Sequence, residues 1–171
     1  MDVPEMLINY NMFLEGARQA GTVDVTLPNV QAVTQSIQGA GIAGVADVPV
    51  LGHTQDMTMT VNFRVATADI RLLLPQQYHH IEFWPALQTL DSGTGKLAVV
   101  DHKVIVKGMV KGDNLGTLNP GEVQGRSLEF NIIYLKELVG GELIREIDKF
   151  NFIYNIGGQD LLSSVRSAIG L

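Results

Sequence analysis

Hydrophobic and polar positions alternate most clearly over residues 126–155, near the end of the chain. Two runs rich in Ile, Leu, Phe and Tyr flank Gly140 and Gly141, and glycine is the residue best able to adopt the positive φ angles of a tight turn. Alternation on both sides of a glycine turn is typical of an antiparallel hairpin. We therefore predict that a long β-hairpin organises the fold.

The charged side chains predict the register of this hairpin. A two-residue loop would place Lys136 opposite Arg145, and directly opposed like charges are unfavourable. A three-residue loop, residues 140–142, brings opposite charges together and puts the aromatic residues on one face, each pair contributing about 0.2–1 kcal/mol. We expect this loop. The predicted pairs are Val139–Leu143, Glu137–Arg145, Lys136–Glu146, Leu135–Ile147, Ile132–Phe150 and Phe130–Phe152.

The second face of the predicted hairpin mixes polar and aliphatic residues. An antiparallel sheet with one face in water usually alternates cleanly between apolar and polar residues. We therefore expect the aliphatic residues of this face to be covered, either by the chain's own helix or by another subunit. They are Ile133, Leu135 and Ile147, and the polar residues among them are Asn131, Lys149 and Asn151.

Shorter segments predict the rest of the domain. Two have helical spacing: residues 68–77, which Pro75 interrupts, and residues 159–169, whose apolar stripe could lie on a sheet. The order of strands, a helix, more strands and a closing helix predicts one antiparallel α+β domain over residues 1–171 rather than a βαβ repeat. The further strands are expected over residues 7–15, 22–27, 54–65, 81–87 and 97–110.

Three segments are less regular. Residues 29–38 fit a helix and a strand equally well. Residues 39–52 contain four glycines and Pro49 and fit a loop or an extended arm. Residues 111–125 form a polar, glycine-rich loop, whose length indicates a functional or mobile segment and whose glycine content predicts disorder before assembly.

The composition of the chain bears on how much of its surface faces water. The chain has 171 residues, enough to bury a core. Its net charge of −6 argues against the usual basic nucleic-acid-binding surface, although not against the passage of DNA. Charged residues make up 18% of the chain, below the roughly 25% of ordinary soluble domains, and mean hydropathy is +0.16. We expect part of the surface to be buried in an assembly; the alternative is a monomer with a polar, uncharged surface.

Other kinds of site find little support. The chain has no cysteine, which excludes disulfides and thiolate metal sites, and neither a signal peptide nor an apolar run of about 18–20 residues is visible. Residues 39–44 match G-x-G-x-x-G, but VADVPV follows and will not open the helix that a dinucleotide needs. His79 and His80 would point to opposite faces of a strand. We expect no catalytic residue, cofactor or metal ion.

Six short motifs are distributed along the whole chain, and each of them alone is unspecific. Together with the chain length, their order and spacing resemble those of the major tail tube proteins of contractile-tailed bacteriophages and of related phage-derived bacteriocins. The closing helix departs from the family pattern, because it has no basic cluster beyond Arg166. We therefore expect no family charge contacts at this helix. The motifs are NMFLEG (11–16), VTLP (25–28), GAGIAG (39–44), DKFN (148–151), GGQDL (157–161) and the terminal IGL (169–171).

The resemblance implies a small β-barrel or sandwich with one or two flanking helices, whose copies form hexameric rings. Rings would stack into a hollow tube inside a contractile sheath and conduct DNA. The implied partners are further copies of the chain, a tail sheath protein, baseplate or initiator proteins, a tail terminator protein and passing DNA, without membrane insertion. The implied location is the virion tail, assembled in the host bacterial cytoplasm.

The loops at 39–53 and 111–125 resemble contact elements between rings and between subunits. The residues expected at subunit interfaces are Gly39, Gly41, Gly44, Asp113, Asn114, Leu115, Ile133, Leu135 and Ile147. Two alternatives stay open: the tube ring of a contractile bacteriocin, injection or secretion apparatus, and a monomeric β-barrel that binds a small apolar ligand. An enzyme is the weakest hypothesis.

Overall fold

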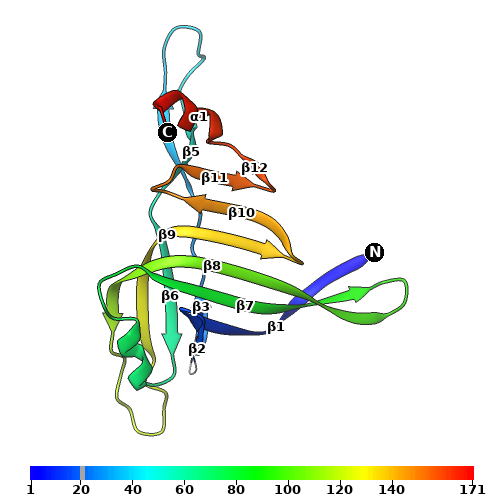
Figure 1. Cartoon of the computed structure of the whole chain (residues 1–171), viewed down its shortest axis with the longest axis vertical. Helices are drawn as coiled ribbons and strands as arrows, with labels where there is room; N and C mark the ends of the chain where they lie inside the picture. Colours follow the sequence, from blue (N-terminus) through cyan, green and yellow to red (C-terminus); the bar gives the residue numbers. More distant parts are fainter. Residues whose placement is uncertain (20–21) are drawn as a thin grey trace.

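The computed structural model describes residues 1–19 and 22–171, most of them in antiparallel strands (Figure 1). The strands are β1 (Asp2–Leu14), β2 (Ala17–Gln19), β3 (Thr22–Thr26), β4 (Ala32–Ile37), β5 (Ala46–Thr54), β6 (Met57–Phe63), β7 (His79–Asp91), β8 (Lys96–Asn114), β9 (Arg126–Val139), β10 (Glu142–Asp148), β11 (Ile153–Ile156) and β12 (Gln159–Asp160). A 3-10 helix, η1 (Ala68–Leu72), and an α-helix, α1 (Ser163–Ile169), complete them.

The main sheet has the order β12-β11-β10-β9-β8-β7-β1-β2, and β6 joins it by pairing with both β9 and β3. Strands β4 and β5 form a separate two-stranded sheet. The predicted class, mainly antiparallel β with a flanking helix, is confirmed. Among the described residues the strand pairing does not close into a barrel, so the fold is an open sandwich.

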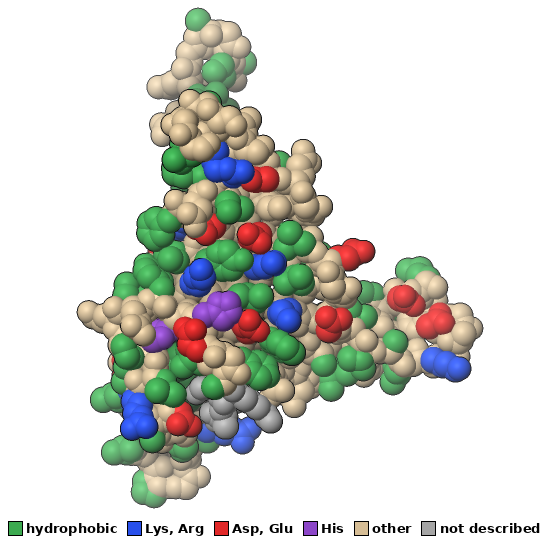
Figure 2. All heavy atoms as spheres, in the orientation of Figure 1, with side chains coloured by type: hydrophobic (Ala, Val, Ile, Leu, Met, Phe, Trp, Pro, Cys, Tyr) green, Lys and Arg blue, Asp and Glu red, His purple; other side chains and the backbone are tan. Residues whose placement is uncertain are grey.

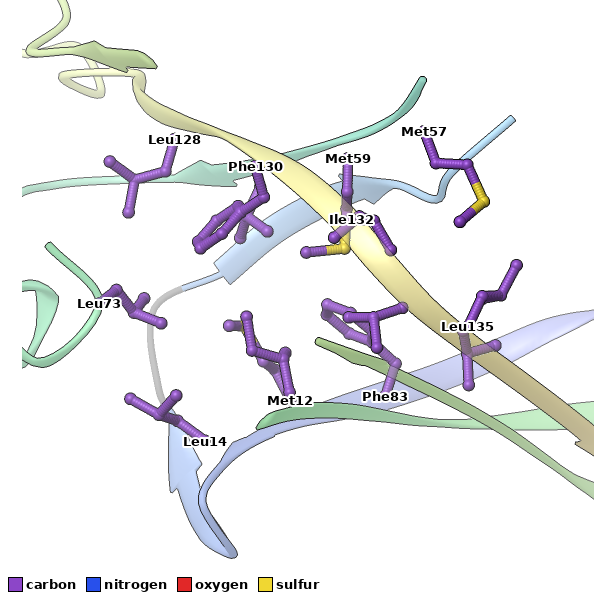
Figure 3. Packing of buried hydrophobic residues seen from close by; sticks show 14 of the residues in the cluster. Met12, Leu14, Met57, Met59, Leu73, Phe83, Leu128, Phe130, Ile132 and Leu135 are labelled. Carbon is purple, nitrogen blue, oxygen red and sulfur yellow. The ribbon is translucent and has the colours of Figure 1, made fainter. Parts of the chain in front are cut away.

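The core lies where the β6–β9 part of the sheet packs against the part formed by β1, β7 and β8. In Figure 3 the labelled side chains of β6 and β9 point toward Met12, Leu14 and Phe83 of the opposite layer, and Leu73 closes one end. Fully burying one such side chain stabilises a fold by about 1.5–3 kcal/mol. Alternation in β6 predicted its buried face correctly: Met57, Met59, Val61 and Phe63.

The β9–β10 hairpin confirms the central predicted pairs but has a different loop. Gly140 and Gly141, with φ of 57° and 80°, form a two-residue turn between Val139 and Glu142. The extra residue that the charge pairing requires is Ile144, which bulges out of β10. A bulge shifts the register by one residue, as a longer loop would. The confirmed pairs are Glu137–Arg145, Lys136–Glu146 and Leu135–Ile147.

The outer pairs of the predicted hairpin are wrong. Strand β10 ends at Asp148, so Phe150 and Phe152 lie beyond it and do not pair with Ile132 and Phe130. The first half of β9 pairs instead with β6 and β8. Val139 likewise faces Glu142 rather than Leu143, because the turn is shorter than predicted.

A second bulge changes which residues of β9 are buried. Lys107 pairs with Tyr134 and Gly108 with Ile132, which leaves Ile133 as the extra residue. Because the bulge reverses the alternation, Leu135 joins the core face of Leu128, Phe130 and Ile132. Leu135 is 5% exposed and its partner Ile147 only 2%, so the chain's own core covers both. The expectation that they share a second face with Ile133 is wrong.

Several element boundaries also differ from the predicted ones. Residues 32–37 form a strand, which resolves the ambiguity over 29–38. Residues 39–52, predicted as a loop or an extended arm, contain the turn after β4 and the first part of β5. The predicted helix over 68–77 is the short η1, which ends before Pro75, and the closing helix begins at Ser163. Gly170 caps that helix in the left-handed conformation.

Candidate assembly surfaces

A three-stranded extension projects from the side of the body (Figure 1). It consists of residues 2–9 of β1, 86–91 of β7 and 96–101 of β8, with β7 in the middle. In the described part of the chain, β2 pairs with β1 only from Met12 onward and β9 pairs with β8 only from His102 onward. Both edges of the extension therefore lack a strand partner, which makes them available for pairing with another chain.

One face of the extension is apolar and exposed. Met6 pairs with Gln88 and Gln88 with Val99, while Val3 pairs with Leu90 and Leu90 with Leu97, so these side chains share a face. We call the exposed residues Val3, Met6, Leu97 and Val99 the extension patch. Leu97 and Val99 are 63% and 64% exposed. Figure 2 shows hydrophobic side chains along the extension and charged ones at its tip.

The β4–β5 hairpin projects at one end of the long axis of the molecule (Figure 1). Its tip contains Gly39, Gly41 and Gly44, all with positive φ, and strand β5 follows, so the G-x-G-x-x-G match opens no helix. Exposed aliphatic residues, among them Ile42 and Val45, surround the glycines. The structure thus brings these three predicted interface residues together on an apolar tip.

The loop over residues 115–125 projects at the opposite end of the long axis (Figure 1). Gln124 fixes its base: the side-chain amide donates to the Leu115 carbonyl oxygen at 2.8 Å, and its oxygen accepts from the Ala66 amide at 2.9 Å. The backbone amide of Gln124 also donates to the Arg64 carbonyl oxygen, at 2.8 Å. The side chains of Leu118 and Val123 are nevertheless exposed. The loop is therefore an apolar tip on a hydrogen-bonded base.

The remaining predicted interface residues precede this loop. Asp113 and Asn114 are the last residues of β8, and Leu115 is exposed just beyond them. The guanidinium of Arg126 donates to both carboxylate oxygens of Asp113, at 3.2 and 2.6 Å. Asn114 accepts a hydrogen bond from the Gly116 amide at 3.0 Å. This group lies far from the glycine tip within one chain, so the two sets can meet only between copies.

Charged side chains on the outer face of the main sheet largely neutralise one another. Glu82 accepts a hydrogen bond from the indole of Trp84 at 2.8 Å and contacts the ring of His80 at 2.9 Å. The His80 contact is the main cause that lowers the pKa of Glu82, with burial opposing it. Lys103 Nζ lies 4.1 Å from the centre of the Trp84 ring, a cation–π contact. The body accordingly shows both signs of charge interspersed (Figure 2).

Tyr134, on the same face, has a strongly raised pKa. Burial, assisted by the negative charges of Glu146 and Asp148, raises its pKa to about 12. Lys107 Nζ lies 5.2 Å from the Tyr134 ring. A phenol that holds its proton more firmly is a weaker acid and stays neutral near pH 7, so the raised pKa gives no sign of an activated, ionised group.

The described residues offer little to metal or cofactor chemistry. His79 is buried and its Nε2 lies 3.1 Å from the Pro75 carbonyl oxygen, whereas His80 points the other way, as predicted for neighbours on a strand. Within residues 1–19 and 22–171, no three His, Asp or Glu side chains are grouped to hold a metal ion. In the same residues no helix has the length and apolar character needed to cross a membrane.

A hollow between residues 27–30 and the sheet bears on the apolar-ligand alternative. Its polar lining groups, Glu137 and Arg145, pair with each other at 3.1 Å, and Glu137 also contacts His102 at 3.1 Å. The rest of the lining is aliphatic and includes Val104 and Leu135. The charged groups of this hollow are thus engaged in a structural network.

The sequence interpretation missed the extension. It ended the strands at Leu87 and began the next at Leu97, because residues 90–95 have the composition of a turn. The observed turn is shorter, and Asp91 caps it by accepting from the Gly93 amide at 2.9 Å. The signal was present in the apolar run from Leu97 to Val100, which lacks the alternation of a half-buried strand.

Comparison with known proteins decides the family. The family model described as phage tail tube protein FII matches residues 4–170. The chain belongs to this tail tube family. It is 26% identical to the major tail tube protein of Serratia phage KSP20 over 175 aligned positions, which cover 100% of this chain and 99% of the relative. The resemblance drawn from the motifs is confirmed, and the chain is a phage tail tube protein.

Solved structures support the fold of this tail tube protein. One is a chain of the sheath–tube complex of an extracellular contractile injection system, PVC, in the extended state; the TM-score is 0.53 at 9% identity, with 75% of this chain and 87% of the other covered. Another is a chain of the PVC sheath/tube terminator structure, with a TM-score of 0.53 at 10% identity and coverage of 79% and 96%. At these identities the likeness concerns the fold alone.

Proposed function

We propose that this tail tube protein forms hexameric rings that stack into a hollow tube within a contractile sheath, and that DNA passes through the tube. The observation that carries this proposal is the placement of three apolar projections. The extension leaves the side of the body, while the β4–β5 hairpin and the 115–125 loop lie at opposite ends of its long axis (Figure 1). Lateral and axial surfaces of this kind suit a polymer that is built from rings.

Lateral contacts use the extension. A chain that buries a surface on one side against a different surface on the other side makes a heterologous contact, which closes into a ring when the rotation allows. Strand pairing with the neighbouring copy would remove the two free edges, and side chains of that copy would cover the apolar face of the extension. Ile133, which is partly exposed on its bulge, stays a proposed interface residue, whereas Leu135 and Ile147 are assigned to the core.

Axial contacts join consecutive rings. The glycine tip with Gly39, Gly41 and Gly44 would meet the segment from Asp113 to Leu115 and its loop in the next ring. Both tips carry exposed aliphatic side chains, so their contact would bury apolar area on both sides. The rigid base that Gln124 gives the loop limits the conformational entropy lost on stacking.

The proposed partners follow from the relatives. The PVC structures contain a sheath and a terminator, and we propose a tail sheath protein and a tail terminator protein as partners here, together with a baseplate or initiator complex that starts the tube. The paired charges and the net charge of −6 suit a wall along which DNA slides without being held. We assign no catalytic role. The chain would assemble in the host bacterial cytoplasm and reside in the virion tail.

Electron microscopy of the purified protein tests the proposal. Negative-stain images and light-scattering mass are recorded over a range of concentrations, with and without an initiator complex. Rings or hollow tubes are the expected result. A strict monomer that still fails to polymerise on an initiator overturns the proposal and favours a ligand-binding monomer.

A second candidate function is suggested by the two solved structures named above, because both come from an injection system. A tube ring of a contractile bacteriocin, injection or secretion apparatus would have the same contacts and a different cargo. Particles isolated from producing cells separate the two: nuclease-protected DNA is expected only of a phage tail that is attached to a capsid.

A further inference from the structure

The turn between β10 and β11 displays an aromatic side chain in water. Phe150 lies in the DKFN motif and is 71% exposed. Neither the extension nor the two axial tips includes it. Exposed aromatic residues that are held in place are typical anchors of protein interfaces, where a few such residues carry most of the binding free energy.

Hydrogen bonds hold this turn from within and from the neighbouring strands. Asp148 Oδ1 accepts from the backbone amides of Phe150 and Asn151, at 3.2 and 3.1 Å. Lys149 Nζ donates to the Gln55 carbonyl oxygen at 2.7 Å, which ties the turn to the segment before β6. Phe150 is therefore presented on a fixed backbone.

The backbone just beyond Phe150 is strained. Phe152 has a φ of 51°, in the left-handed region that residues other than glycine rarely adopt. Arg166 maintains this conformation by donating to the Phe152 carbonyl oxygen at 2.6 Å, and Asp160 holds Arg166 through an ion pair of 2.6 Å. A strained and hydrogen-bonded turn that exposes an aromatic ring is organised for binding before its partner arrives.

The same chain carries a surface suited to this ring. The β10–β11 turn lies on the side of the body opposite the extension (Figure 1). The extension patch offers exposed aliphatic side chains and the thioether of Met6, and sulfur packs favourably against aromatic rings. Complementary surfaces on opposite sides of one chain are the condition for a heterologous, ring-forming contact.

We propose that Phe150 of one subunit docks on the extension patch of the next subunit around the ring, against Met6 and Val99. The inference rests on the proposed ring assembly and identifies the residues that form its lateral contact. The occupant is a second copy of this chain, because the extension would otherwise expose its apolar face and Phe150 would lack an apolar partner.

Cysteine crosslinking tests this contact directly, since the natural chain contains no cysteine. F150C chains and V99C chains are mixed in equal amounts with an excess of wild-type subunits, assembled, and treated with a short bismaleimide. We expect a crosslinked dimer that contains one chain of each variant. V45C, at an exposed position near the axial tip, replaces V99C in the control and should give no dimer with F150C.

A second variant measures the strength of the contact. F150A should raise the concentration at which rings form at least tenfold and leave the unfolding midpoint of the monomer unchanged, because the side chain is mostly in water. Y78A, at an exposed tyrosine between η1 and β7, is the matched control and should change neither value.

The outcomes separate this inference from the proposed function. Tubes that form without the F150C–V99C dimer, or F150A chains that assemble at the wild-type concentration, overturn the docking of Phe150 and leave the tube function standing. Wild-type protein that forms neither rings nor tubes, even on an initiator complex, overturns both.

Discussion

Glu137 and Arg145 lie side by side, with Arg145 Nε 3.1 Å from Glu137 Oε2, because Ile144 bulges out of β10. Without the bulge a two-residue turn would set Lys136 opposite Arg145. The ion pair and the buried Leu135–Ile147 pair therefore share one register, which the bulge establishes.

Replacing Glu137 tests the contribution of this pair. Glu137→Gln should lower the free energy of unfolding by about 1 kcal/mol, since the pair is partly exposed and His102 also loses a charged partner. Asp47→Asn, on an exposed position of β5, is the control. Urea unfolding of the monomer measures both, and equal midpoints for the two variants would show that the ion pair contributes nothing.

Leu135→Glu distinguishes a core residue from an interface residue. The side chain is 5% exposed, so burial of a carboxylate should destabilise the monomer by at least about 3 kcal/mol and prevent folding at moderate temperature. Ile133→Glu, two residues away on the bulge, should fold. Thermal unfolding of both variants is monitored by circular dichroism. A folded Leu135→Glu monomer that fails to assemble would show that Leu135 is an interface residue.

Leu97→Glu should have the opposite effect. The residue is 63% exposed on the extension patch, so the monomer should melt at the wild-type temperature, whereas rings should require at least tenfold more protein because a charge would be buried at the lateral contact. Val65→Glu, at an exposed position after β6, should leave assembly unchanged. Normal tube formation by Leu97→Glu would exclude the extension patch from the contact.

Tyr134 should ionise late in an alkaline titration. Burial raises its pKa from 10.0 to about 12, so between these values the folded chain keeps a proton that the unfolded chain releases. The stability that this group contributes is full below pH 10 and is lost as the pH rises toward 12. Phenolate absorbance should show a late step that Tyr134→Phe removes. An unchanged titration curve in that variant would contradict the assigned shift.

Gln124→Ala should loosen the 115–125 loop. The variant loses the side-chain hydrogen bonds to Ala66 and Leu115, so hydrogen exchange of the Ala66 amide should accelerate, and stability should fall by about 1–2 kcal/mol. Gln38→Ala, beside the glycine tip, serves as control. The glycine content predicted that this loop is disordered before assembly. Fast hydrogen exchange of the Ala66 amide in the wild-type chain would show that the base of the loop is not held by Gln124.

Alternation predicted the strands that have one buried and one wet face, and β6 is the clearest example. Alternation could not predict the bulges at Ile133 and Ile144. Each bulged residue is apolar and has apolar residues close to it in the sequence, so the extra residue is not visible in the pattern. The register was recovered where side-chain charge constrained it, at Glu137 and Arg145, and was lost beyond Asp148, where no charge pair continued.

The assembly surfaces were predicted unevenly for a related reason. Glycine marked the axial tip at Gly39 to Gly44, because positive φ angles require it. The extension gave no comparable signal, since strands that are covered only in an assembly need not alternate. Gln159 and Asp160 fitted a helix locally but pair with β11, so tertiary pairing decided their conformation.

An electron cryo-microscopy reconstruction of the assembled tube would show directly whether the extension forms the lateral contact. We expect each extension to be paired along a free edge with the neighbouring subunit of its ring and its apolar face to be covered. A tube in which the extensions point into solvent, with subunits joined through other surfaces, would contradict it.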